Sequence, residues 1–466
     1  MSSLGKRERH VLIILVAGVF LGFLNQTLMN TALPNVMREF NITTTLGQWL
    51  TNGYMLVNGV MVPLTAFLIQ RLKTRTLYLG AMLIFAVGTL ISGFAPNYLV
   101  LISGRMVQAI GAGVFGPLLN VIVMNLFASD KRGAALGIIG LALNFAPTIG
   151  PTLSGFIVTN LSWRWLFLGV APLIILDLIL AAIFLTNVGE QKFLKFNFLG
   201  VILSSIGLGS LLYGFSNAGN GHWSSPNVWG FVLVGLIVTT LFVFQQIYSS
   251  KPLLTFKVFM YHNFWVSTLI NVVLMTALYG GALMLPLYMQ TVRGQSALIS
   301  GLVLMPGALV TAFLSPTSGK LYDQYGARVL APIGMVLTFL GTVVLATMSL
   351  HTPIWVPAVG QLVRNLGLVL VLMPIQAEAF NAVPLHLMPD ASAMYTTVRQ
   401  VAASFGTAAL ITVYSLISLK QVHAKHTGLQ LADLQGIHIA YWVAAGIVVV
   451  SGLLTLLLHH REDMDI

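Results

Sequence analysis

Two acids and three arginines stand inside long apolar stretches of this chain. The acids are Asp177 and Glu378, and the arginines are Arg105, Arg364 and Arg399. An ion placed in lipid costs about 2.5 to 3.5 kcal/mol on insertion scales, so such residues normally face a cavity or a partner. A carboxyl group in that setting can exchange a proton when water reaches it from one side. Asp177 and Glu378 are therefore candidate proton carriers, and Arg105 is a candidate binding residue.

Polar and adaptable side chains lie at similar depth in several of the same stretches, which indicates a substrate cavity. Helical spacing places members of one stretch on a shared face, and aromatic and methionine side chains suit ligands of varied shape. The candidate cavity residues, besides Arg105, are Asn25, Gln26, Asn30, Tyr54, Asn58, Gln108, Tyr279, Met284, Gln361 and Asn365. For any one Asn or Met, hydrogen bonding between helices or packing against lipid is an equally good explanation.

The elements that hold these residues are membrane-spanning helices. Of 466 residues 57% are hydrophobic and 8% are charged, and the mean hydropathy is +0.89. A helix of about 20 apolar residues crosses the hydrocarbon layer, and long continuous apolar runs exclude the alternating strands of a barrel. We predict an all-α polytopic membrane protein with fourteen transmembrane helices near 10–31, 46–69, 76–94, 98–124, 133–158, 164–186, 197–216, 227–247, 262–290, 298–318, 329–350, 353–379, 392–418 and 436–459.

Composition also removes several classes of function. Cysteine is absent, so disulfides and thiolate metal sites are excluded, and we expect no metal and no cofactor. The ten histidines are scattered without ligand spacing, which argues against a membrane enzyme. A repeated pore filter, as a channel would need, does not appear.

The basic residues predict the orientation in the membrane. With the N-terminus inside, fifteen of the 23 Lys and Arg fall on cytoplasmic segments and five on external ones. This distribution obeys the positive-inside rule, and an even number of spans places both termini in the cytoplasm. The net charge of +11 then reflects topology and contact with anionic lipid, and it gives no indication of a nucleic-acid partner.

The loop between the tenth and eleventh spans repeats an earlier loop. It reads "PTSGKLYDQYGAR" at 316–328, and 253 residues earlier the chain reads "PLTAFLIQRLKTR" at 63–75. Such a repeat is typical of transporters built from two similar halves. We therefore expect an N-terminal six-helix half at 1–189, a cytoplasmic linker with an inserted helix pair at 190–257, and a C-terminal six-helix half at 258–466.

Several motifs in order along the chain resemble one family. The loop pattern with Gly319, Asp323, Gly326 and Arg328 resembles the cytoplasmic signature of the major facilitator superfamily. The segments "LNQTLMNTALP" (24–34), "GRMVQAIGAG" (104–113) and "GIIGLALNFAPTIGPTLSG" (137–155) are similar to motifs of its fourteen-span drug:proton antiporter branch. The resemblance covers nearly the whole chain.

The resemblance implies a multi-pass protein of the cell membrane that exports drugs or other amphipathic small molecules by alternating access, in exchange for protons. Its expected partners are a small-molecule substrate, the lipid bilayer and protons, and we expect a monomer that is not an enzyme. One departure stands out, because the family's span-one acid is Asn25 here, and an amide cannot carry a proton. Export of a lipid, peptide or metabolite, or coupling to something other than protons, stays an alternative.

Two of the motifs have more than one physical interpretation. Asp323 can accept hydrogen bonds from helix amides or pair with Arg328, forming a latch between conformations, or the loop can be a simple solvated turn. In span five, Gly150, Pro151 and Gly155 permit a helix that bends between states, or a close packing seam. Glu378 can likewise be a proton carrier, or a structural gate paired with Arg399.

Overall fold

The computed structural model describes residues 6–42, 44–128, 131–188, 197–218, 225–249, 252–425 and 428–459, and these contain helices and no strand. Thirteen helical stretches in that part of the chain have the length and composition of membrane spans. The helix α5 (Arg132–Asn160) is a further long helix of 29 residues. The predicted all-α polytopic fold is therefore confirmed.

The first bundle holds helices α1 to α7, which pack mainly on one another except for α5, whose most extensive contacts are with α11 of the second bundle. Their bounds are α1 Lys6–Phe40, α2 Thr44–Arg71, α3 Thr74–Gly93, α4 Tyr98–Leu126, α5 Arg132–Asn160, α6 Trp165–Leu168 and α7 Ala171–Phe184. The predicted single helix 164–186 is interrupted between α6 and α7. The reason is Pro172, at the start of α7, because proline has no amide hydrogen to continue the preceding helix.

A helix pair and a second bundle follow. The pair is α8 (Phe198–Asn217) and α9 (Pro226–Tyr248). The bounds of the second bundle are α10 His262–Leu287, α11 Ala297–Tyr325, α12 Ala327–Ala346, α13 Trp355–Asn381, α14 Met388–Lys425 and α15 Leu429–Leu454. The first residues of the expected segment 190–257, up to residue 196, lie outside the described residues, so the cytoplasmic linker stays a prediction.

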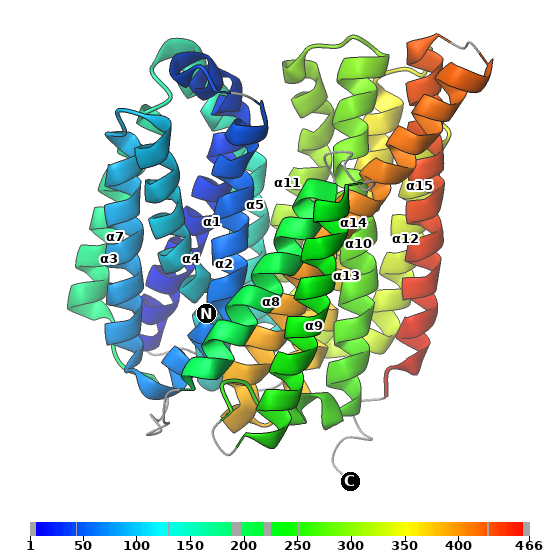
Figure 1. Cartoon of the computed structure of the whole chain (residues 1–466). Coiled ribbons are helices and arrows are strands. Elements are labelled where there is room, and N and C mark those ends of the chain that lie inside the picture. The colour runs from blue at the N-terminus through cyan, green and yellow to red at the C-terminus, as the bar shows by residue number, and fades with distance from the viewer. Residues whose placement is uncertain are drawn as a thin grey trace.

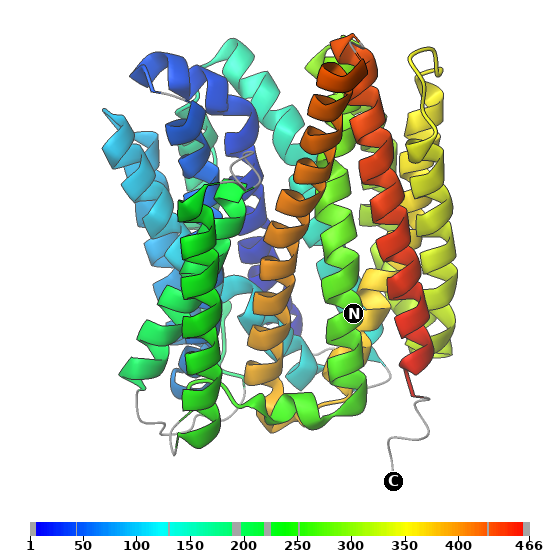
Figure 2. The same ribbon diagram turned by 45° about the vertical axis from the view of Figure 1, so that its right-hand side comes forward.

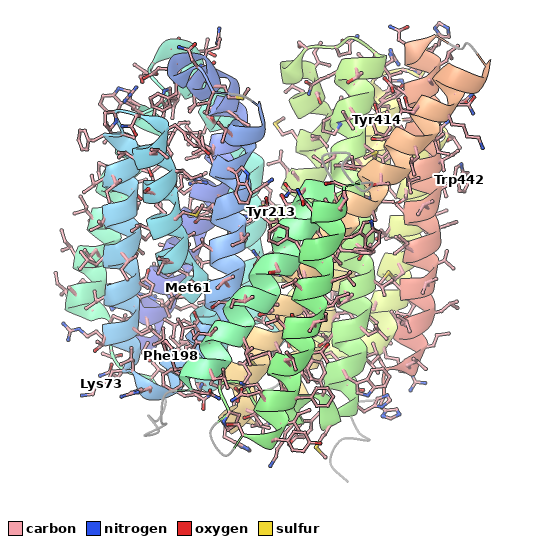
Figure 3. All side chains as sticks on the ribbon, in the orientation of Figure 1. Met61, Lys73, Phe198, Tyr213, Tyr414 and Trp442 are labelled. Carbon is pink, nitrogen blue, oxygen red and sulfur yellow. The ribbon has the colours of Figure 1, made fainter. Side chains whose placement is uncertain are left out.

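The axes of the long helices in both bundles are roughly aligned, as Figures 1 and 2 show. We call the end with Lys73 the lower face and the opposite end, toward Tyr414, the upper face (Figure 3). The α8–α9 pair lies at the seam between the bundles (Figure 1), where α8 contacts both α2 and α14.

Aromatic and amide contacts hold α8 in that seam. The rings of Trp49 on α2 and Tyr213 on α8 stack at 5.2 Å. Close by, Asn52 donates a hydrogen bond of 2.6 Å to the hydroxyl of Ser216. On the other side, the rings of Phe215 and Phe405 meet edge to face at 5.2 Å. The inserted pair therefore bridges the two bundles.

The internal repeat appears in the packing of the bundles as well as in the sequence. A Cβ atom added at Gly88 on α3 would lie 2.4 Å from the backbone nitrogen of Gln108 on α4. At Gly341 on α12, which is 253 residues further along, a Cβ would lie 2.4 Å from the backbone nitrogen of Arg364 on α13. Small residues let transmembrane helices approach this closely. The two bundles thus use the same glycine positions for the same crossing.

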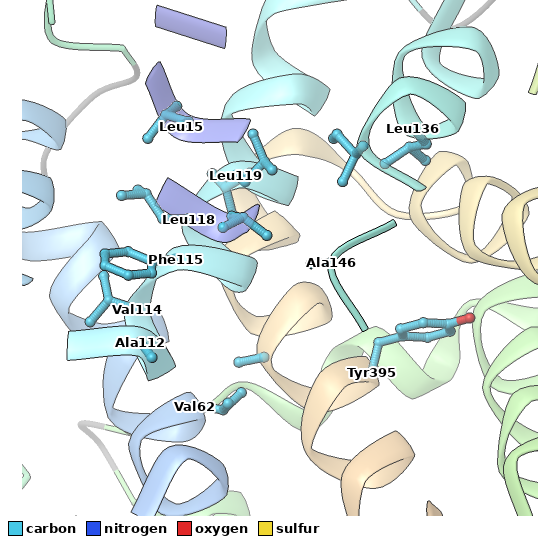
Figure 4. Close-up of a cluster of buried hydrophobic side chains, with 14 of the residues drawn as sticks. Leu15, Val62, Ala112, Val114, Phe115, Leu118, Leu119, Leu136, Ala146 and Tyr395 are labelled. Atoms are coloured by element: carbon cyan, nitrogen blue, oxygen red, sulfur yellow. The ribbon is translucent and has the colours of Figure 1, made fainter. Parts of the chain in front are cut away.

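A cluster of buried apolar side chains surrounds α4, as Figure 4 shows. Phe115 lies 5.6 Å from Phe85 and 5.7 Å from Tyr78, measured between ring centroids, and Leu118 and Leu119 are buried beside it. Lipid tails are as apolar as these side chains, so close packing rather than escape from water favours this arrangement. The cluster therefore joins α3 and α4, which carry Thr89, Arg105 and Gln108.

Candidate functional site

The loop acid Asp323 caps a helix of the other bundle. One of its carboxylate oxygens accepts from the amide of Gly133 at 2.9 Å, and the other accepts from the amide of Ala134 at 2.8 Å. The helix-capping residue of α5 itself, Lys131, makes no side-chain cap. A carboxylate at a helix N-terminus satisfies orphan amides and interacts well with the helix dipole. Of the two partners predicted for Asp323, the structure therefore shows the helix amides.

Glycines bring the two bundles together at this cap. A Cβ at Gly319 would lie only 2.0 Å from the carbonyl oxygen of Gly133. One turn further, a Cβ at Gly137 would lie 2.5 Å from the carbonyl oxygen of Ser315. The loop turn itself is made by Gly326, whose φ of 74° ends α11, a conformation that glycine adopts at little cost. Arg328 is exposed beyond that turn.

A chain of hydrogen bonds leads from this crossing to the buried acid Glu378. Arg132 on α5 donates to Asn381 at 3.0 Å, and Asn381 donates to the hydroxyl of Tyr322 at 3.0 Å. Tyr322 in turn donates to Glu378 at 3.0 Å, and Asn263 donates to its second oxygen at 2.6 Å. These contacts place Glu378 at the lower end of the second bundle, tied to the first bundle through Arg132.

The earlier copy of the loop has a different arrangement. Gln70 occupies the position that corresponds to Asp323, and it donates at 3.4 Å to Asp390, a buried acid in the first turn of α14. The same oxygen of Asp390 accepts from the backbone amide of Thr255 at 3.2 Å, just after the inserted helix pair. Here the acid belongs to the second bundle and the amide donor to the first. Both lower contacts therefore join an acid of the second bundle to a donor of the first, and only the role of the loop position is reversed, being an acid at Asp323 and a donor at Gln70.

Arg105 forms the centre of a polar cluster in the upper half of the first bundle. The side chain is fully buried, and it donates to the backbone oxygen of Leu50 at 3.2 Å and that of Asn25 at 3.1 Å. It also donates to the side chain of Gln108 at 3.1 Å, and its guanidinium lies 4.3 Å from the ring centroid of Tyr54. The shared depth predicted for Asn25 and Arg105 is thus a direct contact.

Gln108 completes this cluster. Its amide nitrogen donates to Thr89 at 2.7 Å and to the side-chain oxygen of Asn25 at 3.3 Å. Two donor atoms of the cluster, Asn25 Nδ2 and Arg105 Nη2, are buried and have no hydrogen-bond partner among the described residues. Buried donors of this kind carry a desolvation cost of about 1 to 3 kcal/mol each. The cluster is therefore rich in donors.

The second bundle buries Arg364 at a comparable place on α13. Arg364 donates to the backbone oxygen of Ala277 at 3.3 Å, and its Nε atom has no partner in the described part of the chain. Gln361, one turn earlier, donates to Asn365 at 3.4 Å. An arginine and a glutamine three residues apart thus occur in both bundles, in reversed order, and Arg105 donates to Gln108 whereas Gln361 donates to Asn365.

Asp177 lies away from both arginines. The hydroxyl of Tyr78 donates to its carboxylate at 2.6 Å and also contacts the backbone oxygen of Ile14 at 3.0 Å. Tyr78 is in the first turns of α3, so this acid lies nearer the lower face than the middle of the bundle. It is buried between α1, α3 and α7.

The remaining predicted residues are less tightly grouped. Gln26 and Asn58 are partly buried, Tyr279 is 44% exposed, and the side chain of Asn30 lies outside the described residues. Met284 is fully buried in an apolar cluster with Tyr288 and Tyr441. In this conformation Met284 is therefore packed in an apolar cluster, and its place on a cavity wall stays a prediction.

The span-five motif packs against α1. A Cβ at Gly150 would lie 2.3 Å from the hydroxyl of Thr27, and Ser154 donates to the backbone oxygen of Leu28 at 2.7 Å. Gly155 continues the same helix, and the side chain of Pro151 lies outside the described residues. In this conformation the motif makes a close seam, which was one of its two interpretations.

Sequence reasoning missed several polar partners. Asp390 was placed outside the predicted span 392–418, although α14 begins at Met388. Tyr78, Tyr322 and Asn263 hold the two buried acids. The pairing of Glu378 with Arg399 stays a prediction. The one signal in the sequence that pointed to Asp390 was the repeat, in which Gln70 stands where the second loop has Asp323 and therefore needs a different partner.

Comparison with known proteins gives a consistent result. Residues 15–407 match the family model described as Major Facilitator Superfamily. The chain is 43% identical over 95% of its length to the uncharacterized MFS-type transporter YcnB of Bacillus subtilis, and it covers 93% of that protein. It is 34% identical to the lincomycin resistance protein LmrB of the same organism, over 98% of this chain and 96% of that protein.

A solved structure agrees in fold. The human organic anion transporter MFSD10 (TETRAN) superposes with a TM-score of 0.70, covering 96% of this chain and 99% of that one. The sequence identity is 14%, so this likeness shows the fold alone.

Proposed function

The chain belongs to the Major Facilitator Superfamily, and we propose that it is a secondary active exporter of drugs or other amphipathic small molecules in the fourteen-span drug:proton antiporter branch. The observation that carries this proposal is the arrangement at the lower face. There the two bundles meet at glycine-tight crossings, and a carboxylate on one bundle caps a helix of the other. Contacts of this kind can form and release as a unit.

The contacts between α5 and α11 support alternating access. Described contacts run from the cap at Asp323 up to the ring pair Phe145 and Phe313, whose centroids lie 6.2 Å apart. Both rings lie near the middle of their helices. Rocking of the halves 1–189 and 258–466 about this region would release the lower contacts. The inserted segment 190–257 would then have to slide against α2 or α14, since α8 contacts both.

We propose that the lower face is cytoplasmic and that the protein works as a monomer in the cell membrane. The positive-inside distribution supports this orientation, since Lys73, Lys131 and Arg132 lie at the lower ends of the helices. Both termini are then cytoplasmic. With this orientation, the closed lower face of the structure would be the cytoplasmic side.

Proton exchange is the proposed driving reaction, with Asp177 or Glu378 as the carrier. Neither acid contacts Arg105 or Arg364, and each accepts a hydrogen bond from a tyrosine hydroxyl. A tyrosine hydroxyl donates to the carboxylate form and accepts from the carboxylic acid form, so either protonation state has a partner. Export coupled to another ion, or export of a lipid, peptide or metabolite, is the alternative.

The name of the relative LmrB supports the drug proposal, because 34% identity over nearly the full length covers the whole transport path. Cells that express the chain should tolerate higher concentrations of amphipathic antibiotics than cells that lack it. They should also extrude fluorescent dyes, and an uncoupler should stop the extrusion. Equal drug susceptibility and equal dye retention in both strains would refute the proposal, and extrusion that survives the uncoupler would refute proton coupling.

A further inference from the structure

The polar cluster around Arg105 has more donors than acceptors. The positive side chain is fully buried, and its acceptors are two backbone oxygens and the amide oxygens of Asn25 and Gln108. Asn25 Nδ2 and Arg105 Nη2 are both buried donors without a partner in the described residues. The two side chains are in contact, because Arg105 Nη1 lies 3.5 Å from Asn25 Oδ1. Two unsatisfied donors, one of them cationic, therefore lie in one small region.

Among the residues that the structure describes, no carboxylate compensates this charge. In the described part of the chain neither Arg105 nor Arg364 contacts an acid, because the protein partners of both are backbone oxygens, amides and aromatic groups. The two acids of the predicted spans are held elsewhere, Asp177 by Tyr78 and Glu378 by Asn263 and Tyr322. A buried charge normally has a counter-charge.

Position 25 explains why the charge is uncompensated. An aspartate there would accept from both Arg105 and Gln108, and it would neutralise the guanidinium. Asparagine replaces one acceptor oxygen by an amide donor and removes the negative charge, while its carbonyl oxygen keeps the contacts to Arg105 and Gln108. With aspartate at position 25 this region would be a neutral ion pair, and with asparagine it is a cationic site rich in hydrogen-bond donors.

We propose, on the premise that the chain exports amphipathic small molecules, that its substrates are organic anions. The acidic group, a carboxylate or a sulfonate, is recognised by Asn25 Nδ2 and Arg105 Nη2 as α1 and α4 open toward the transport path. Arg364 gives the facing bundle the same sign of charge. In the low-dielectric interior a cation attracts an anion over a longer range than in water, so both arginines favour anions and oppose cations.

The test compares dyes of opposite charge in liposomes that contain the purified protein. The anionic probes are carboxyfluorescein and anilinonaphthalene sulfonate, and the cationic probes are ethidium and acriflavine. The wild-type protein should transport the anions at least tenfold faster than the cations. In Asn25→Asp the new carboxylate should occupy the donors of Arg105, so that anion transport falls at least tenfold while cation transport is unchanged or increased.

A matched control separates this effect from the general cost of a buried acid. Asn271→Asp also places an acid at a buried asparagine, one that donates to Tyr395 at 2.7 Å in the second bundle, and it should keep the preference for anions. Binding of carboxyfluorescein, followed by fluorescence anisotropy in detergent, should weaken at least tenfold in Asn25→Asp even if transport stops.

The outcomes distinguish the two proposals. If the wild-type protein transports only the cationic dyes, the anion assignment is wrong and the export proposal stands. The same holds if Asn25→Asp transports and binds the anions as well as the wild-type protein does. If no dye of either charge crosses faster than in liposomes without protein, both the export proposal and the anion assignment fail.

Discussion

Adding one methyl group at the lower crossing should open the closed face. In Gly319→Ala the new Cβ would lie 2.0 Å from the carbonyl oxygen of Gly133, whereas ordinary contacts begin at 3.4 Å. The obstacle is backbone, so α5 and α11 have to separate by about 1.4 Å. That displacement carries the Asp323 contacts from 2.9 and 2.8 Å to about 4 Å, beyond hydrogen-bond distance.

The cost of that separation can be estimated from the two lost hydrogen bonds. A hydrogen bond to a charged group contributes about 1.5 to 3 kcal/mol, and the lower value applies because Asp323 is partly exposed. Two such bonds amount to about 3 kcal/mol, which corresponds to roughly a hundredfold change in the ratio of closed to open molecules, since each 1.4 kcal/mol is tenfold. The closed state should therefore lose its predominance.

The absence of cysteine in this chain makes the assay simple. Spin labels on cysteines introduced at the exposed positions Lys131 and Gln324, on opposite sides of the crossing, report its opening as a distance distribution. Gly319→Ala should shift that distribution to longer distances. Gly301→Ala on the same helix should leave it unchanged, because a Cβ there meets nothing within 4 Å. Identical distributions in Gly319→Ala and wild type would refute the reasoning.

Three further changes test the other polar contacts. Asp323→Asn keeps one acceptor but loses the charge, so it should change the ratio of closed to open molecules, read from the same label distances, by about tenfold. Unchanged distances would mean that the loop is only a solvated turn. Arg105→Ala should abolish dye export while the amount of protein in the membrane stays normal, and wild-type efflux would contradict the role of the cluster. The double variant of Asp177→Asn and Glu378→Gln should lose transport driven by a proton gradient but keep substrate exchange without a gradient. Full gradient-driven flux in that variant would exclude both acids as carriers.

The fold could be predicted from the sequence because spans are fixed by the thickness of the membrane. Apolar length alone located the helices, and the repeat at 63–75 and 316–328 indicated two similar halves. The break before Pro172 and the early start of α14 at Met388 were not predicted. Both depend on local helix ends, which apolar length does not determine. The packing of α8 against α2 and α14 was likewise not predicted, because the sequence of an apolar transmembrane helix does not specify which helices it contacts.

The candidate site was predicted in part for the same physical reason. Charge in an apolar stretch identified Arg105, Asp177 and Glu378. The similar depth of Arg105 and Asn25 in their spans predicted that the two residues lie close together. The partners Tyr78 and Tyr322 were missed, because a tyrosine in a span has no unusual cost and so gives no signal. Met284 was assigned to a cavity on its chemistry alone, and the direction of its side chain depends on packing across helices that are distant in sequence.

Reversible cross-linking of the lower face tests alternating access most directly. A disulfide between cysteines at Lys131 and Gln324, on the two sides of the α5–α11 crossing, would hold the halves together in purified protein in liposomes. The account expects dye transport by the reduced double-cysteine protein, loss of transport on oxidation, and recovery on reduction, while each single-cysteine protein is insensitive to the oxidant. Transport that continues at the same rate in the cross-linked protein would contradict it.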